Sequence, residues 1–165
     1  MDKFFSRVRL ESILFFGFLF FILIQFYRPN KNNASYVPIN DFLEDLNAPD
    51  KINSLIKNSC YDCHSNKTNY KWFNNIAPVS WWIDNTIERG KTAFNFSDWK
   101  AFQPWRKLSY LNAIVFDIQS NKMPKEQYVL MHPSVKLSKN EKQQIIDWVN
   151  SINKTDIYNE NEIHY

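Results

Sequence analysis

The chain has 165 residues, which is enough for one modest domain and an additional segment. Its hydrophobic content of 44% excludes an intrinsically disordered chain, and its 2 cysteines and 2 glycines exclude a disulfide-rich scaffold and a collagen-like protein. The formal net charge of +3 is too small to indicate nucleic-acid binding, so we expect no nucleic-acid partner. An aromatic content of 17% in so short a chain still needs an explanation.

Residues 1–28 are predicted to form an N-terminal signal anchor. A basic start is followed by an unbroken apolar run over residues 13–24. A membrane-spanning helix needs roughly 20 residues and the apolar part of a signal peptide roughly 7–15, so both interpretations remain open. Because no small-residue cleavage site or lipobox cysteine follows, we favour an uncleaved transmembrane helix. This predicts a single-pass protein of the inner membrane with a periplasmic C-terminal domain. The alternative is a cleaved signal and a soluble periplasmic protein.

The rest of the chain is predicted to be all-α. Residues 29–41 lack periodicity and are interpreted as a tether, residues 42–152 as one domain, and residues 153–165 as a polar tail. Apolar residues recur at helical spacing in four segments, with no convincing strand pattern. A capping box at Ser138 and Glu141 opens the last segment, and Gly90 is expected to end the second. The segments cover residues 49–60, 78–89, 104–118 and 138–152.

Both cysteines lie in the motif Cys60-Tyr-Asp-Cys63-His64, which is the C-x-x-C-H attachment pattern for c-type haem. Two thiols at this spacing add to the two vinyl groups of haem, and the next residue, His64, becomes an axial ligand of the iron. One motif predicts one covalently bound haem c. The alternatives are a zinc site that also uses His64, a thioredoxin-like redox pair and a structural disulfide.

The sixth iron ligand is predicted to be Met123, which is followed by a proline and precedes the last helical segment. A methionine beside a proline before the last helix is a familiar distal ligand in small cytochromes c. His132 is the alternative ligand, and Met131 is a weaker one. An iron without a sixth protein ligand also remains possible. His164 belongs to the predicted polar tail and is not expected to bind iron.

The order of motifs along the chain resembles the haem-binding domain family of bacterial exported proteins. The resemblance covers residues 42–150 and implies covalent haem in a small, mainly helical, cytochrome c-like domain of about four helices. It does not imply a reaction. The motifs are Cys60–His64, residues 76–81 and 95–99, Met123-Pro124, Tyr128, His132-Pro133, Leu137-Ser138 and Trp148.

These observations predict a membrane-tethered, single-haem cytochrome that binds haem and transfers one electron at a time on the outer side of the inner membrane. No acid–base pair, phosphate-binding loop or HExxH motif is visible, so we assign no catalytic residue and expect a carrier more than an enzyme. The alternative is a haem enzyme or sensor with an open sixth position, either peroxidase-like or gas-binding. Aromatic residues between 72 and 105 are expected to supply a few haem contacts. Five lysines flank the segment that contains the predicted sixth ligand and its alternative, and their positive charge favours acidic redox partner proteins. They are Lys122, Lys125, Lys136, Lys139 and Lys142.

Overall fold

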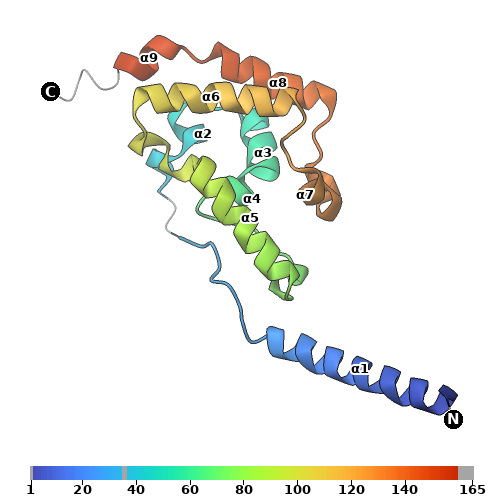
Figure 1. The fold of residues 1–165 in the computed structure, drawn as a ribbon. Helices are drawn as coiled ribbons and strands as arrows, with labels where there is room; N and C mark the ends of the chain where they lie inside the picture. Colours follow the sequence, from blue (N-terminus) through green and yellow to red (C-terminus); the bar gives the residue numbers. More distant parts are fainter. Residues whose placement is uncertain (1, 35–36, 160–165) are drawn as a thin grey trace. The chain divides into compact units, whose positions relative to one another are not determined.

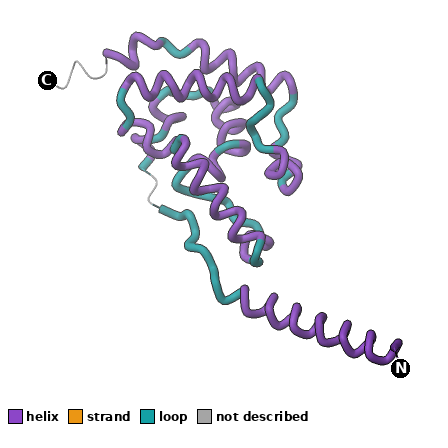
Figure 2. The backbone as a smooth tube through the Cα atoms, in the orientation of Figure 1, coloured by secondary structure: helices purple, strands orange, loops and turns teal. Residues whose placement is uncertain are grey.

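The fold was analysed in a computed structural model, which describes residues 2–34 and 37–159. Side chains are described for residues 9–34 and 37–158. In this part of the chain all regular structure is helical, apart from one isolated bridge between Asn33 and Lys67 (Figures 1 and 2). The α-helices are α1 (Asp2–Ile24), α2 (Phe42–Asp45), α3 (Asp50–Ser59), α4 (Tyr61–His64), α5 (Val79–Ala93), α6 (Pro104–Gln119), α7 (Glu126–Met131), α8 (Lys139–Ser151) and α9 (Lys154–Asn159). The 3-10 helices are η1 (Pro38–Asn40), η2 (Trp72–Asn75), η3 (Phe96–Ala101) and η4 (Pro133–Val135).

The all-α prediction is confirmed, but the expected number of about four helices in the domain is wrong. The four periodic segments correspond to α3, α5, α6 and α8. The other α-helices of the core unit have only four to six residues, which is too short for an apolar periodicity to be recognised. The predicted polar tail also begins with α9, whose Ile157 is buried in the core.

The chain folds as two compact units. The N-terminal unit comprises Met1–Lys31 and Asn69–Thr86, and the core unit comprises Asn32–Thr68 and Ile87–Tyr165. Helix α5 begins in the first unit and ends in the second.

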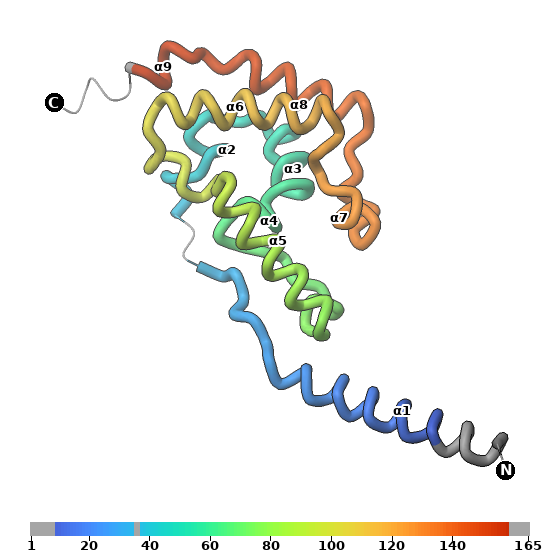
Figure 3. Tube along the Cα trace, viewed as in Figure 1, coloured from blue at the N-terminus to red at the C-terminus, as the bar shows by residue number. Residues whose placement is uncertain are grey.

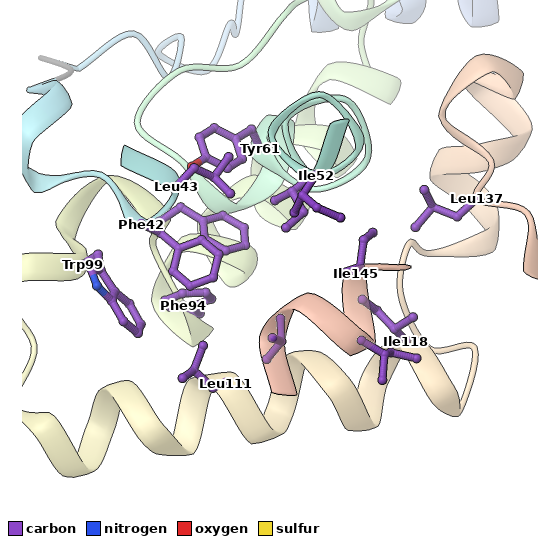
Figure 4. Packing of buried hydrophobic residues seen from close by; sticks show 14 of the residues in the cluster. Phe42, Leu43, Ile52, Tyr61, Phe94, Trp99, Leu111, Ile118, Leu137 and Ile145 are labelled. Carbon is purple, nitrogen blue, oxygen red and sulfur yellow. The ribbon is translucent and has the colours of Figure 1, made fainter. Parts of the chain in front are cut away.

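In the core unit, α6 packs against α8 and α9, and α3 packs against α8 and α4 (Figure 3). A cluster of aromatic side chains lies at the centre of the core unit, between these helices (Figure 4). Phe42 and Trp99 are completely buried, with ring centroids 4.9 Å apart, and Phe94 lies 6.0 Å from Phe42. Aromatic side chains of this size dominate the burial energy of a small core. Tyr61 and Phe96 are further aromatic members of the buried cluster. Its other buried members are aliphatic, and most of them lie on the surrounding helices, which explains the periodicity seen in the sequence.

The capping box predicted at the start of the last long helix is confirmed. The Ser138 hydroxyl accepts a hydrogen bond from the backbone N–H of Glu141 at 3.3 Å, and the Glu141 carboxylate accepts one from the Ser138 N–H at 2.8 Å. These bonds satisfy amide groups that have no partner within the helix, and they fix where α8 begins.

In the N-terminal unit, residues 25–27 are joined to Ala77, which precedes α5, and to Trp81 in the first turn of α5. The Gln25 side chain accepts a hydrogen bond from the Ala77 N–H at 2.9 Å and donates one to the Ala77 carbonyl at 3.2 Å. The Trp81 indole N–H donates to the Tyr27 carbonyl at 2.9 Å.

Among the described residues, no helix combines the length and apolar character that crossing a membrane requires. The transmembrane helix predicted over residues 1–28 is therefore not supported.

Asp41 is a fully buried acid that caps α2 in the core unit. Its Oδ1 accepts hydrogen bonds from the Leu43 N–H at 3.0 Å and the Tyr61 hydroxyl at 2.7 Å. Its Oδ2 has no hydrogen-bond partner in the described part of the chain. Burial raises the pKa of this carboxyl above its ordinary value, although both hydrogen bonds oppose the shift. The charged form is therefore disfavoured in the folded protein.

The substitution Asp41→Asn is expected to preserve or increase the free energy of unfolding at neutral pH. Asparagine keeps an oxygen for both donors and carries no charge. Because the folded-state pKa of Asp41 lies above its unfolded value, this residue's contribution to stability is full below about pH 4 and is lost as the pH rises through the folded pKa. Urea denaturation at several pH values should show that the free energy of unfolding depends less on pH in D41N than in the wild type. Asp41→Ala, which loses both hydrogen bonds, should cost roughly 1–3 kcal/mol. A large loss of stability in D41N at neutral pH would contradict this account.

Candidate functional site

The C-x-x-C-H motif forms a single helical turn at the end of α3. Cys60 separates α3 from α4, and its carbonyl accepts hydrogen bonds from the N–H groups of Cys63 at 3.2 Å and His64 at 3.0 Å. This turn keeps the two cysteines and the histidine on one short segment. Both cysteines are half-buried free thiols, so the disulfide alternative is not supported.

The two thiols are held in their neutral form. Burial raises the pKa of the Cys60 thiol to about 12. Burial also raises the pKa of the Cys63 thiol to about 11, with the Asp62 carboxylate adding to the shift and Lys125 opposing it. A thioredoxin-like pair needs a lowered thiol pKa to generate its nucleophilic thiolate. These surroundings therefore disfavour a dithiol redox centre.

His64 is oriented by a backbone carbonyl. Its Nδ1 donates a hydrogen bond to the Phe94 carbonyl at 3.0 Å. Burial lowers the pKa of His64 below its ordinary value, against the opposing effect of hydrogen bonds to the carbonyls of Phe94 and Gly90. The imidazole is therefore neutral at physiological pH, and its remaining lone pair is on Nε2. This is the orientation that metal-binding histidines adopt when a carbonyl holds their other nitrogen.

Gly90 allows α5 to approach the motif closely. A Cβ atom at this position would meet the Cys63 carbonyl oxygen, and it would lie 3.0 Å from the Cys63 carbonyl carbon and 3.2 Å from the Cys63 Cβ. The prediction that Gly90 ends the second helix is wrong, because α5 continues through it to Ala93. The glycine is required for contact between two segments and not for a helix end.

The two residues between the cysteines are fixed by contacts of their own. The Tyr61 ring is buried and stacks on Phe96, with ring centroids 4.9 Å apart and an interplanar angle of 12°, and its hydroxyl donates to Asp41. The Asp62 carboxylate accepts a hydrogen bond from the Tyr128 hydroxyl at 2.7 Å. The motif turn is therefore attached to the aromatic core on one side and to α7 on the other.

The Met123 segment lies within electrostatic reach of His64. The Met123 N–H donates to the Asp117 carbonyl at 3.2 Å, which folds the segment back on the end of α6. The Asp117 carboxylate raises the pKa of His64 and the Lys125 ammonium lowers it, so charges on both sides of Met123 act on the imidazole. Met123 itself is half-buried.

His132 follows α7 and is also connected to the motif. It is half-buried, its Nδ1 lies 3.2 Å from the Tyr128 carbonyl, and the two rings have centroids 4.5 Å apart. Tyr128 in turn contacts Asp62. Both candidate sixth ligands therefore belong to segments that contact the motif or act on it electrostatically. Met131 is half-buried, and His164 lies outside the described residues.

The residues present fit a covalently attached haem. Two neutral thiols share one turn with an imidazole that has an available lone pair, and a glycine removes bulk beside the second cysteine. Within the described residues there is no group of three or more His, Cys, Asp or Glu side chains that could hold a metal ion, so the zinc alternative is not supported. Sequence reasoning missed Asp41, Asp62, Phe94 and Gly90. Of these four residues, only Gly90 is marked in the sequence, because a glycine beside an apolar helical pattern is unusual, and we interpreted it as a helix end.

The aromatic residues divide into two groups. Trp99 is completely buried, and its indole N–H donates to Asp45 at 2.9 Å. Trp72 and Trp105 are largely exposed, with 76% and 63% of their surface accessible. Trp99 is therefore a core residue, whereas Trp72 and Trp105 leave most of their surface uncovered.

Comparison with known protein families places the chain in one of them. The family model described as "Haem-binding domain" matches residues 19–151, which is most of the chain. The protein therefore belongs to the haem-binding domain family, and the resemblance inferred from the motifs is confirmed. Searches of curated proteins and of solved structures found no match to this chain.

Proposed function

We propose that this protein is a single-haem c-type cytochrome that transfers one electron at a time. Cys60 and Cys63 would hold the haem through thioether bonds, and His64 would be an axial ligand of its iron. The observation that carries the proposal is the His64 Nδ1 hydrogen bond to the Phe94 carbonyl, which leaves Nε2 available on the same turn as both thiols. When bound, haem supplies a one-electron iron couple whose potential depends on its ligands and its surroundings.

We propose Met123 as the sixth ligand. Its segment is held by the hydrogen bond to Asp117, and the neighbouring Lys125 acts on the electrostatics of both Cys63 and His64. A thioether sulfur has no proton to lose, so ligation by Met123 would not depend on pH near neutrality. Ligation by His132 would require a neutral imidazole and would weaken as the pH falls.

The basic residues of this region support an electrostatic encounter with acidic redox proteins. Lys125, Lys136 and Lys139 are exposed, and Lys125 influences the pKa of the motif residues. Positive charge beside a haem site would accelerate association with an acidic partner, and this acceleration would decrease as the salt concentration rises.

The proposed location is the periplasmic side of the inner membrane. Thioether attachment normally takes place outside the cytoplasm, so the protein would have to be exported. The basic start and apolar run of residues 1–28 would direct this export and keep the protein at the membrane.

Absorption spectroscopy of Met123→Ala and His132→Ala tests the sixth ligand. The wild type is expected to be six-coordinate and low-spin, and not to bind carbon monoxide when reduced. M123A should lose the low-spin spectrum and bind carbon monoxide, because removing the thioether opens one position of the iron. H132A should keep the wild-type spectrum.

The neighbouring substitution Met131→Ala is the matched control, since it removes a thioether outside the proposed ligand set. If H132A loses the low-spin spectrum and M123A keeps it, then His132 is the ligand and the Met123 assignment is wrong. If the wild type itself binds carbon monoxide readily, the carrier function is wrong and the enzyme or sensor alternative is correct.

A further inference from the structure

The N-terminal unit contains a cavity that the haem site does not use. Its volume is about 130 Å³, and it is lined by residues from two segments of this unit. Ligand pockets for drug-sized molecules have volumes of roughly 300–1,000 Å³, so this cavity suits a smaller group. Its lining includes Arg28, Lys31, Asn74 and Asp84.

Asn74 provides a buried acceptor in the wall of this cavity. Only 9% of its surface is exposed, and its Oδ1 has no hydrogen-bond partner in residues 9–34 and 37–158. A buried carbonyl oxygen without a partner costs free energy that a bound donor would recover. The missing partner must carry an N–H or O–H group.

The charged residues of the cavity indicate a ligand with both signs of charge. Arg28 and Lys31 provide two cations, and Asp84 provides one anion. A phosphate suits the two cations, because guanidinium and ammonium groups both donate charge-assisted hydrogen bonds to phosphate oxygens. An ammonium group suits Asp84 and can also donate to the Asn74 oxygen.

Exposed aromatic residues adjoin the cavity residues in both segments. Phe26 and Tyr27 directly precede Arg28 and are 83% and 70% exposed. Trp72, which is 76% exposed, lies in η2 together with Asn74. Tryptophan and tyrosine concentrate where a membrane meets water, and basic residues bind lipid phosphates at the same depth. The same unit also contains the exposed apolar residues of α1.

We propose that this cavity binds the headgroup of a phospholipid that carries a phosphate and a primary ammonium, as phosphatidylethanolamine does. The phosphate contacts Arg28 and Lys31, and the ammonium donates to Asn74 and Asp84. The exposed aromatic residues contact the surrounding lipid. The inference rests on the proposed location at the membrane but requires neither a spanning helix nor bound haem.

Lipid binding to the full-length haem-loaded protein tests this site. The protein is purified in dodecyl maltoside, and its lipid complexes are measured by native mass spectrometry with dihexanoyl phosphatidylethanolamine and dihexanoyl phosphatidylcholine. Choline has no N–H to donate, so the ethanolamine lipid should bind about tenfold more tightly. The R28Q/K31Q double variant should lose about tenfold or more in affinity for both lipids. Asn74→Leu should remove the preference for ethanolamine and keep binding of the choline lipid.

Lys71→Gln is the matched control, because it removes an exposed positive charge from the same unit without changing the cavity. It should bind both lipids like the wild type. Equal binding of the two lipids, or an unchanged affinity in R28Q/K31Q, would overturn the proposal. Binding of O-phosphoethanolamine or inorganic phosphate as tightly as the lipid would assign the cavity to a soluble anion and overturn the lipid assignment. The haem spectrum of each variant separates these outcomes from failure of the cytochrome proposal, since the lipid variants should keep the wild-type spectrum.

Discussion

Replacing Cys60 and Cys63 together with serine is expected to abolish covalently bound haem. A serine hydroxyl does not form the thioether bond that a cysteine thiol forms with a vinyl group. The substitution is small and the two positions are half-buried, so the helical fold should persist. Acid–acetone extraction and haem staining on a denaturing gel measure the loss, and circular dichroism checks the fold.

Asn58→Ser is the control for this experiment. It introduces a serine at an exposed position two residues before the motif and should leave haem content unchanged. If haem resists extraction from the C60S/C63S variant, it is attached elsewhere and the proposed site is wrong. If the wild type contains only extractable haem, the protein binds haem without thioether bonds and the c-type assignment fails.

Gly90→Ala is expected to destabilise the protein and to reduce its haem content. The added methyl group would collide with the backbone carbonyl of Cys63, so either α5 or the motif turn would have to shift. Overpacking of this kind typically costs about 1–3 kcal/mol, although alanine recovers up to about 1 kcal/mol through its helix propensity. Urea denaturation should show a lower free energy of unfolding, and the haem-to-protein ratio should fall.

Gly17→Ala provides the matched control, because a Cβ at Gly17 has no neighbouring atom within 4 Å. It makes the same chemical change inside another helix and should not lower stability or haem content. If G90A and G17A behave alike, then the close approach of α5 to the motif does not constrain Gly90.

The long helices and the chemistry of the motif could be predicted from the sequence, because each has a local signal. Ile52 and Ile56 mark the buried face of α3, and the spacing of Cys60, Cys63 and His64 specifies the attachment pattern. The short helix α7 has no such signal, since six residues contain fewer than two helical turns. Its position depends on the hydrogen bond between Tyr128 and Asp62, which joins residues far apart in the sequence.

The surroundings of His64 could not be predicted for a different reason. Its hydrogen-bond acceptor is the backbone carbonyl of Phe94, and every residue has a carbonyl, so residue identity carries no information about this contact. The same limit applies to the tryptophans. Composition indicated many aromatic residues but could not separate the buried Trp99 from the exposed Trp72, because that difference arises only when the helices pack.

The contacts of Tyr61 and Asp62 restrict how the sequence can vary during evolution. The general pattern allows any residue between the two cysteines, but here Tyr61 bonds to the buried Asp41 and Asp62 accepts a hydrogen bond from Tyr128. A change at position 61 would remove one hydrogen-bond donor from the fully buried Asp41, and a change at position 62 would remove the acceptor of the half-buried Tyr128 hydroxyl. Relatives with this packing should therefore show correlated substitutions between positions 41 and 61 and between positions 62 and 128. These two pairs would connect the motif to segments that lie 20 and 66 residues away in the sequence.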